Sequence, residues 1–409
     1  MPKTSVLREL GRERVAHVTN MELFFDLVYV FAMTQLSEHL YESRTVTGAL
    51  QTTVLFLAIW WAWNQTAWAT NWADPDRLPV ALLMAAMMVL GLVMSAAVLE
   101  AFSTRGLTFA LAYLGMQLLC AAFMVWAFGL REAMGRNYAQ LLAWSLIAGV
   151  AWVAGALTHD GTARLGLWAV AVAVDLAAPL HGFWLPGRRP TPSADWTLAG
   201  GHIAERGQLV LMVAFGESML RIGGSFAQVH GTAGDVTALI VGFLLIFALW
   251  SIYFLHHAPQ GAQSMEQQSH DTARLGRFAY SYAHAVMVGA VIVVAVAIHL
   301  AVSAPQAAVG VAFATICAGG PALFLVGIAL SKRSLGHGRL RPTLAAVVAL
   351  AVIGPLLSLT SRLGELAAVT VLAVAAAVAA QREPEGQRVG SDTTFAAADA
   401  GQRAGDSGS

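Results

Sequence analysis

The feature that most constrains this chain is a succession of about twelve apolar runs, each close to 20 residues long and separated by short polar segments. A bilayer core of about 30 Å requires roughly 20 apolar residues per helix, so each run predicts one transmembrane helix. A transmembrane β-barrel would instead show strands of about ten residues in which apolar and polar side chains alternate. We therefore expect an all-α polytopic membrane protein with about 12 spans, at residues 21–40, 47–69, 78–99, 107–130, 138–157, 165–184, 207–222, 236–256, 279–303, 308–331, 342–360 and 363–381.

The composition excludes most classes of soluble protein. Of the 409 residues, 57% are hydrophobic and 12% are charged, and the mean hydropathy is +0.63. These values are too apolar for a soluble chain of this length. The spacing of Cys and His residues is not that of a metal site, and no basic cluster is dense enough to indicate nucleic-acid binding. We expect a multi-pass protein of the cell membrane, with lipids and a small solute or ion as partners and no cofactor or metal. The sequence is compatible with an oligomer.

Basic residues predict the orientation, because they collect in the cytoplasmic loops of inserted bundles. With twelve spans and a cytoplasmic N-terminus, the 24 Lys and Arg residues all fall on the cytoplasmic side except Arg44, Arg105, Arg164, Arg221 and Arg362. Both termini are therefore expected in the cytoplasm. Residues 1–20 form a charged N-terminal segment without a cleavable signal, and residues 382–409 are predicted to be a disordered tail.

Three correspondences that occur in the same order indicate an internal duplication. "HVTNMELFFDLVYVFAMTQ" aligns with "HIAERGQLVLMVAFGES", "AIWWAW" with "ALWSIY", and "RLPVALLM" with "RFAYSYAH". We predict a first six-helix half at residues 21–184 and a second at 207–381, joined by a cytoplasmic linker at 185–206. An even number of spans per half makes the halves parallel, related by an axis along the membrane normal.

Charged side chains inside spanning helices cost about 2.5–3.5 kcal/mol at the bilayer centre, and they indicate function by default. The acidic residues that stand out in this way are Asp26, Asp175 and Glu217. Asp26 follows Glu22 by one helical turn, so the two carboxylates share a face. Asp26 is either functional or an interfacial group paired with Arg77 or Arg277. Asp175 is either a proton relay or a polar residue packed against polar neighbours.

Glu217 is the strongest candidate of the three. It lies between Gly216, which we expect to allow close backbone approach, and Ser218, whose hydroxyl can form hydrogen bonds. Helical spacing places Arg206 and Arg221 on the same face as Glu217. The alternative is that Glu217 only forms a neutralising salt bridge with Arg221.

Histidines accompany these acids in two places. His202, Glu205 and Arg206 occur at i, i+3 and i+4, so they cluster on the cytoplasmic approach to the seventh run. Arg277 and His284 occur at i and i+7, which predicts a shared helix face. His284 suits proton transfer near neutral pH, although a structural hydrogen bond is the alternative.

Tryptophans gather toward the end of the second run. Indole rings are amphipathic and favour the headgroup level of a membrane. We interpret these residues as an interfacial aromatic belt: Trp60, Trp61, Trp63, Trp68 and Trp72.

The same segments resemble the bacterial low temperature requirement protein A (LtrA) family. "ELFFDLVYVFAMTQLS" resembles the opening signature of that family, "HIAERGQLVLMVAFGES" its second motif, and "YAH" at 282–284 its third. This chain has "RGQ" after Glu205, where a His or Phe and a second bulky residue are usual. The resemblance implies a bacterial polytopic membrane protein whose functional positions are Glu22, Asp26, His202, Glu205, Arg206, Gly216, Glu217, Ser218 and His284.

Three functions agree with these observations. We favour a secondary transporter in which Glu217, Asp26, Asp175 and His284 act as coupling groups. A cation channel is the second, because "FFDLVYVFAMT" resembles the motif that opens each half of a potassium-channel family found in bacteria and lysosomes. The third is a structural or sensory membrane protein. No nucleophile stands beside a base, so we do not expect an enzyme.

Overall fold

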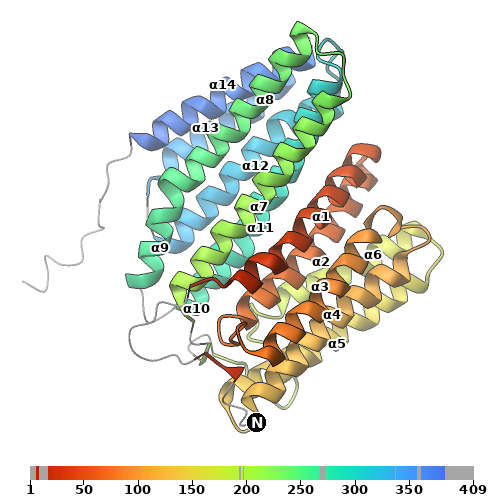
Figure 1. Ribbon diagram of the computed structural model, residues 1–409, viewed down its shortest axis with the longest axis vertical. Coiled ribbons are helices and arrows are strands. Elements are labelled where there is room, and N and C mark those ends of the chain that lie inside the picture. Colours follow the sequence, from red (N-terminus) through yellow and green to blue (C-terminus); the bar gives the residue numbers. More distant parts are fainter. Residues whose placement is uncertain are drawn as a thin grey trace, which may run out of the picture.

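The computed structural model describes residues 6–8, 17–192, 195–196, 198–267, 272–336, 338–356 and 361–382. The first half of the chain contains six long helices (Figure 1): α1 (Asn20–Glu42), α2 (Val46–Ala69), α3 (Leu78–Ala96), α4 (Gly106–Phe128), α5 (Ala133–Leu157) and α6 (Gly161–Ala177), with the short η2 (Val98–Glu100) after α3. The second half begins with α7 (Gly200–Ala227) and α8 (Ala233–Ser251), and α8 continues through the π-helix η4 (Ile252–His257) into α9 (Ala258–Gln267). The short α10 (Thr272–Leu275) continues through the π-helix η5 (Gly276–Ala283) into α11 (His284–Ser303). The last three helices are α12 (Val311–Leu335), α13 (Leu340–Leu356) and α14 (Arg362–Gln381).

These helices confirm the predicted all-α, multi-pass architecture. Within the described ranges, nine helical segments are long and apolar enough to cross a membrane. The remaining predicted spans correspond in order to α1, α6 and α13. α6 has only 17 residues, and α1 carries acidic residues from Glu22 to Glu42. Neither helix is therefore both long and apolar enough to be counted as a membrane span by length and composition. The cytoplasmic placement of the termini stays a prediction, and the proposed tail lies outside the described residues from residue 383 onward.

Two boundaries differ from the sequence prediction in a way that affects the site. α7 covers residues 200–227 rather than 207–222, so it begins inside the segment that the sequence predicts as a linker. His202 and Arg206 in this stretch are polar, but they are buried against Glu22 and Asp26 of α1. α6 ends at Ala177 rather than at residue 184, because Pro179 cannot continue the helix. Asp175 therefore lies in the last turn of α6.

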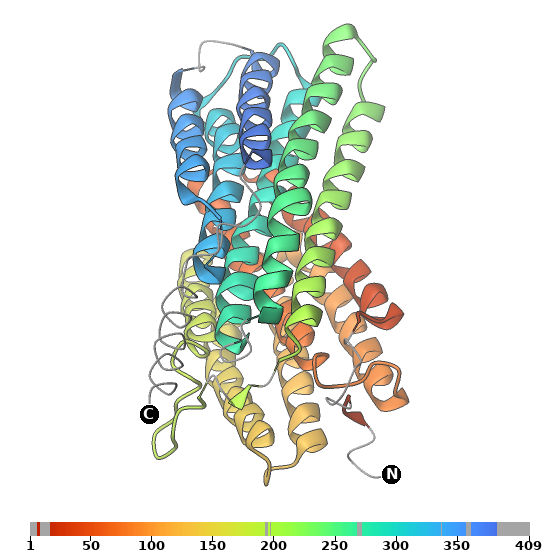
Figure 2. The same cartoon turned by 90° about the vertical axis from the view of Figure 1, so that its left-hand side faces the viewer.

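The two halves form two bundles that lie side by side (Figure 1), and Figure 2 views the pair from the side of the second bundle. The order of neighbours is the same in both. In the first bundle α1 packs on α3, α3 on α4, α4 on α5, α5 on α6, and α2 on α6. In the second, α7 packs on α11, α11 on α12, α12 on α13, α13 on α14, and α8 on α14. α1 and α7 pack against each other where the bundles meet.

The π-helix η5 connects the second bundle to the first. The wider turn of a π-helix changes which carbonyls are bonded within the helix. Trp60 of α2 donates to the Ser281 carbonyl at 2.8 Å, and Trp68 donates to the Ser281 hydroxyl at 3.0 Å. Arg277 and Tyr282 donate to the carbonyls of residues 179 and 176, just beyond and within the end of α6. η5 is therefore anchored on both α2 and α6.

Candidate functional site

The first polar cluster, which we call the inner cluster, consists of Glu22, Asp26, His202 and Arg206 at the ends of α1 and α7 that are predicted to face the cytoplasm. Nη1 and Nη2 of Arg206 lie 2.9 Å from Oδ2 and Oδ1 of Asp26. Trp63 of α2 also donates to Oδ1 of Asp26, at 2.8 Å. Asp26 and Arg206 are 1% and 0% exposed, so this is a fully buried, bidentate ion pair. The alternative in which Asp26 pairs with Arg77 or Arg277 is therefore wrong.

Glu22 and His202 complete the inner cluster. Nε2 of His202 lies 2.9 Å from Oε1 of Glu22, and Arg8 donates to Oε2 of Glu22 at 3.2 Å. Asn71 accepts from the backbone N–H of Ala199, which orients its amide so that Nδ2 faces Nδ1 of His202 at 3.3 Å. Nε2 of His202 also lies 3.5 Å from Nη2 of Arg8, so both ring nitrogens face polar side chains.

Together with Arg8, which contacts Glu22, the inner cluster has equal numbers of carboxylate and guanidinium groups. Two carboxylates, Glu22 and Asp26, face two guanidinium groups, Arg8 and Arg206. Glu22 also forms a capping box with Thr19 at the start of α1, which satisfies backbone N–H groups there. Opposite charges that are buried and joined by hydrogen bonds fix the position of one helix against another. The inner cluster thus holds α1 and α7 together in parallel.

Glu217 belongs to a second group, the outer cluster, which consists of Glu217, Arg221 and Glu38 in the other half of the α1–α7 contact. Glu217 is 1% exposed, and within the described residues neither of its carboxylate oxygens has a close hydrogen-bond partner, although the hydroxyls of Ser37 and Thr34 on α1 are nearby. Nε of Arg221 lies 3.7 Å from Oε1 of Glu217, while the same guanidinium donates to Glu38 at 2.9 Å. The expected contact with Arg221 is thus present but loose. Arg206, predicted on the same face, is bound to Asp26 instead.

The neighbours of Glu217 along α7 do not contribute as expected. A Cβ at Gly216 would meet no atom within 4 Å, so Gly216 allows no close approach. Ser218 donates to the carbonyl of Ala214 in its own helix at 3.0 Å. Glu205 accepts from the backbone N–H of Val18 at 3.1 Å and has a side chain that is 40% exposed. Gly216 has no side chain, and the side chains of Ser218 and Glu205 are bonded elsewhere rather than to the Glu217 carboxylate.

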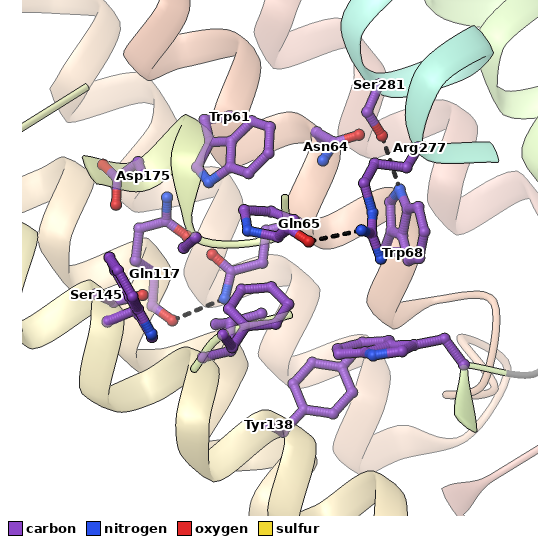
Figure 3. Close-up of a pocket in the computed structure, with 16 residues that line it drawn as sticks. Trp61, Asn64, Gln65, Trp68, Gln117, Tyr138, Ser145, Asp175, Arg277 and Ser281 are labelled. Carbon is purple, nitrogen blue, oxygen red and sulfur yellow. Dashed lines mark hydrogen bonds between the residues drawn. The ribbon is translucent and has the colours of Figure 1, made fainter. Parts of the chain in front are cut away.

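Asp175 lies at a cavity of about 60 Å³ between the first bundle and η5 (Figure 3). Tyr113 and Trp152 donate to the same oxygen of Asp175, Oδ2, at 2.7 and 3.3 Å. Gln117 in turn donates to the hydroxyl of Tyr113 at 2.7 Å. The cavity is also lined by Arg277 of η5. Of the four coupling candidates, Asp175 is the one that lines this cavity.

His284 and Arg277 have different surroundings, although α-helical spacing placed them on one face. The π-helix between them alters that spacing. His284 is buried, with Nε2 2.7 Å from the hydroxyl of Tyr253 and Nδ1 2.7 Å from the carbonyl of Ala279. Arg277 donates to the carbonyl of Pro179 at 2.5 Å. Both ring nitrogens of His284 are thus bonded, as in the structural alternative.

Trp60 and Trp63 of α2, and Trp72 just after it, do not form an interfacial belt. Trp60, Trp63 and Trp72 are each 2% exposed, and they pack inside the protein. Their polar N–H groups explain the location, since Trp60 and Trp63 donate to Ser281 and Asp26. The aromatic signal was visible in the sequence, but burial between the bundles was not.

Sequence reasoning missed Glu365. It lies in the first turn of α14, is fully buried, and has no hydrogen-bond partner for either carboxylate oxygen among the residues described. The signal was an acidic residue inside the last predicted span, 363–381. Asn71 was also missed, because a polar residue in a short loop gives no sign that it orients a histidine.

Two helical bundles that meet through buried charges on membrane-spanning helices define a polytopic membrane protein. The chain belongs to the LtrA family: the model described as "Bacterial low temperature requirement A protein (LtrA)" matches residues 17–379. This match confirms the resemblance drawn from the three motifs. A curated relative, "Uncharacterized protein RA0937" from Rhizobium meliloti (strain 1021), is 34% identical over 313 residues, which are 76% of each chain. No solved structure matches the chain.

Proposed function

We propose that this protein is a secondary transporter of the bacterial cell membrane, built from two parallel six-helix repeats with cytoplasmic termini, and that Glu217 is its coupling group. The observation that carries the proposal is the buried Glu217 carboxylate, which has no hydrogen-bond partner among the described residues. A buried charge without adequate partners is costly, and a bound proton or monovalent cation removes that cost. Glu217 can therefore couple transport to an ion gradient by binding the ion on one side of the membrane and releasing it on the other.

The matching order of neighbours in the two bundles supports the duplication. Proteins built from parallel repeats work by moving one half relative to the other, with sites at the boundary between them. α1 and α7 are the first helices of the two halves, and Glu217 lies at their contact. Its position is that of a group whose access changes when the halves move.

The two clusters suggest which part of the boundary opens. In the inner cluster Asp26 is held by two guanidinium nitrogens and Trp63. In the outer cluster Arg221 lies 3.7 Å from Glu217, and its other partner, Glu38, has a side chain that is 37% exposed. We assign the inner cluster the role of a fixed joint, with Asp26 as an anchor rather than an ion carrier. The outer cluster is the part that separates to admit a proton or cation to Glu217.

The remaining candidates take other roles in this proposal. Asp175 belongs to the solute cavity, and His284 holds η5 against η4 through Tyr253. Membrane lipids and a small solute are the partners, and the proposal includes no chemical reaction on the solute.

Dye-reported proton and potassium fluxes in proteoliposomes test the role of Glu217. We expect proton flux under an imposed gradient to fall at least tenfold in Glu217→Gln, because the amide cannot bind and release a proton. Glu205→Gln is the matched control on the same helix, and it should keep wild-type flux because its side chain is 40% exposed. Potassium flux that is equal in wild type and Glu217→Gln would instead favour a cation channel. Wild-type proton flux in Glu217→Gln would exclude Glu217 as the coupling group.

A further inference from the structure

The cavity beside Asp175 has one charged side chain of each sign. Figure 3 shows Asp175 and Arg277 on opposite sides of the cavity, with Trp61 between them. Asp175 comes from the end of α6 in the first bundle, and Arg277 from η5 in the second. A simple cation would be repelled by Arg277 and a simple anion by Asp175. A ligand with both charges would be attracted at both ends.

The walls of the cavity are rich in aromatic side chains. Six of the sixteen lining residues are aromatic: Trp61, Trp68, Tyr138, Trp144, Phe183 and Trp196. Aromatic faces attract ammonium groups through their quadrupole, and most strongly where water is excluded. The walls therefore favour the positive group of a ligand without adding another charge. The volume of about 60 Å³ leaves room for only a few heavy atoms.

Polar atoms that make no hydrogen bond within the described residues also face this cavity or border it. Both hydrogen bonds to Asp175 go to Oδ2, and none is made to Oδ1 by the described part of the chain. Asn64 lines the cavity and likewise makes no side-chain hydrogen bond there. Oε1 of Gln117 is buried without a partner in the same described part. Buried polar atoms of this kind are expected where a ligand or water completes the bonding.

We propose that the cavity binds a small zwitterion, with its ammonium group toward Asp175 and its carboxylate toward Arg277. The identification of this zwitterion as the transported solute rests on the proposed transport function, whereas binding itself does not. Contacts from both bundles to one ligand would make the occupied cavity sensitive to their relative position.

Isothermal titration calorimetry of the purified full-length protein in detergent tests this proposal with glycine, methylamine and acetate as probes. Glycine carries both charges, and each of the other probes carries one. We expect glycine to bind at least tenfold more tightly than methylamine or acetate. Asp175→Asn should weaken glycine binding at least tenfold. Asp160→Asn is the matched control on α6, because Asp160 caps the far end of the helix and Asn caps equally well.

Variants of Arg277 separate the role of charge from that of shape. Arg277→Gln should reduce the preference for glycine over methylamine, and Arg277→Lys should restore part of it, with folding of each variant checked by its thermal transition. Equal binding of glycine and methylamine by wild type would overturn the zwitterion in favour of a cation site. No glycine binding by a wild-type protein that still moves protons would overturn this inference and leave the transport proposal standing. Glycine binding by a wild-type protein that shows no flux would support the zwitterion site and contradict the transport proposal.

Discussion

Replacing Arg206 with methionine is expected to lower the free energy of unfolding by about 3–5 kcal/mol, the usual cost of removing one partner of a buried ion pair. The change leaves the Asp26 carboxylate buried, with Trp63 as its remaining side-chain donor. Unfolding in mixed micelles by titration with a denaturing detergent measures this difference. Arg105→Met is the control, because Arg105 and its partner Glu100 are about half exposed and such pairs contribute at most about 1 kcal/mol.

A double variant distinguishes a stranded charge from lost packing. If the cost of Arg206→Met comes from the uncompensated carboxylate, the double variant Asp26→Leu, Arg206→Met should recover most of the lost stability, because it removes both charges. An Arg206→Met variant as stable as wild type would show that Asp26 does not depend on its partner. The inner cluster could then not be the joint between α1 and α7.

Replacing Gly207 with phenylalanine is expected to lower the free energy of unfolding by about 3 kcal/mol through overpacking. A Cβ at Gly207 would lie 2.7 Å from Cδ1 of Tyr280 and 3.2 Å from Nε2 of His284. The ring of Tyr280 occupies the space that a side chain at residue 207 would need. Gly216→Phe on the same helix is the control, because a Cβ at Gly216 meets nothing within 4 Å.

Combining Gly207→Phe with Tyr280→Ala tests whether the overpacking comes from the ring of Tyr280. Tyr280→Ala removes the ring that Gly207→Phe would strike. The double variant should therefore be more stable than the sum of the two single changes by about 1–3 kcal/mol, measured as a double-mutant cycle by thermal unfolding. Additive effects would mean that α7 and η5 are not in the contact described.

The number and order of helices could be predicted from the sequence, because a lipid environment imposes long apolar runs that a reader can count. The start of α7 could not, because His202 and Arg206 are polar and their burial depends on Glu22 and Asp26 far away in the chain. Hydropathy reflects the polarity of each side chain and contains no information about a partner that is distant in the sequence.

Within the site, contacts inside one helix could be predicted from the sequence, whereas contacts between helices could not. The contact between Glu217 and Arg221 follows from local helical spacing, and it could be predicted. The partner of Asp26 could not, since it depends on which helices pack together. The burial of Trp60 and Trp63 was missed for the same reason: their hydrogen-bond acceptors lie on other helices.

Cross-linking the two bundles tests most directly whether transport requires them to move. A Cβ at Gly289 of α11 would lie 3.0 Å from the ring of Phe56 on α2, so cysteines at these two positions can be joined by a short, reducible bifunctional thiosulfonate. The native Cys120 and Cys317 are buried, and the two single-cysteine variants control for their reaction. Proton flux in proteoliposomes is predicted to fall at least tenfold in the cross-linked double variant and to return after reduction. Undiminished flux through fully cross-linked protein would contradict the account, because ions would then cross without relative movement of the halves.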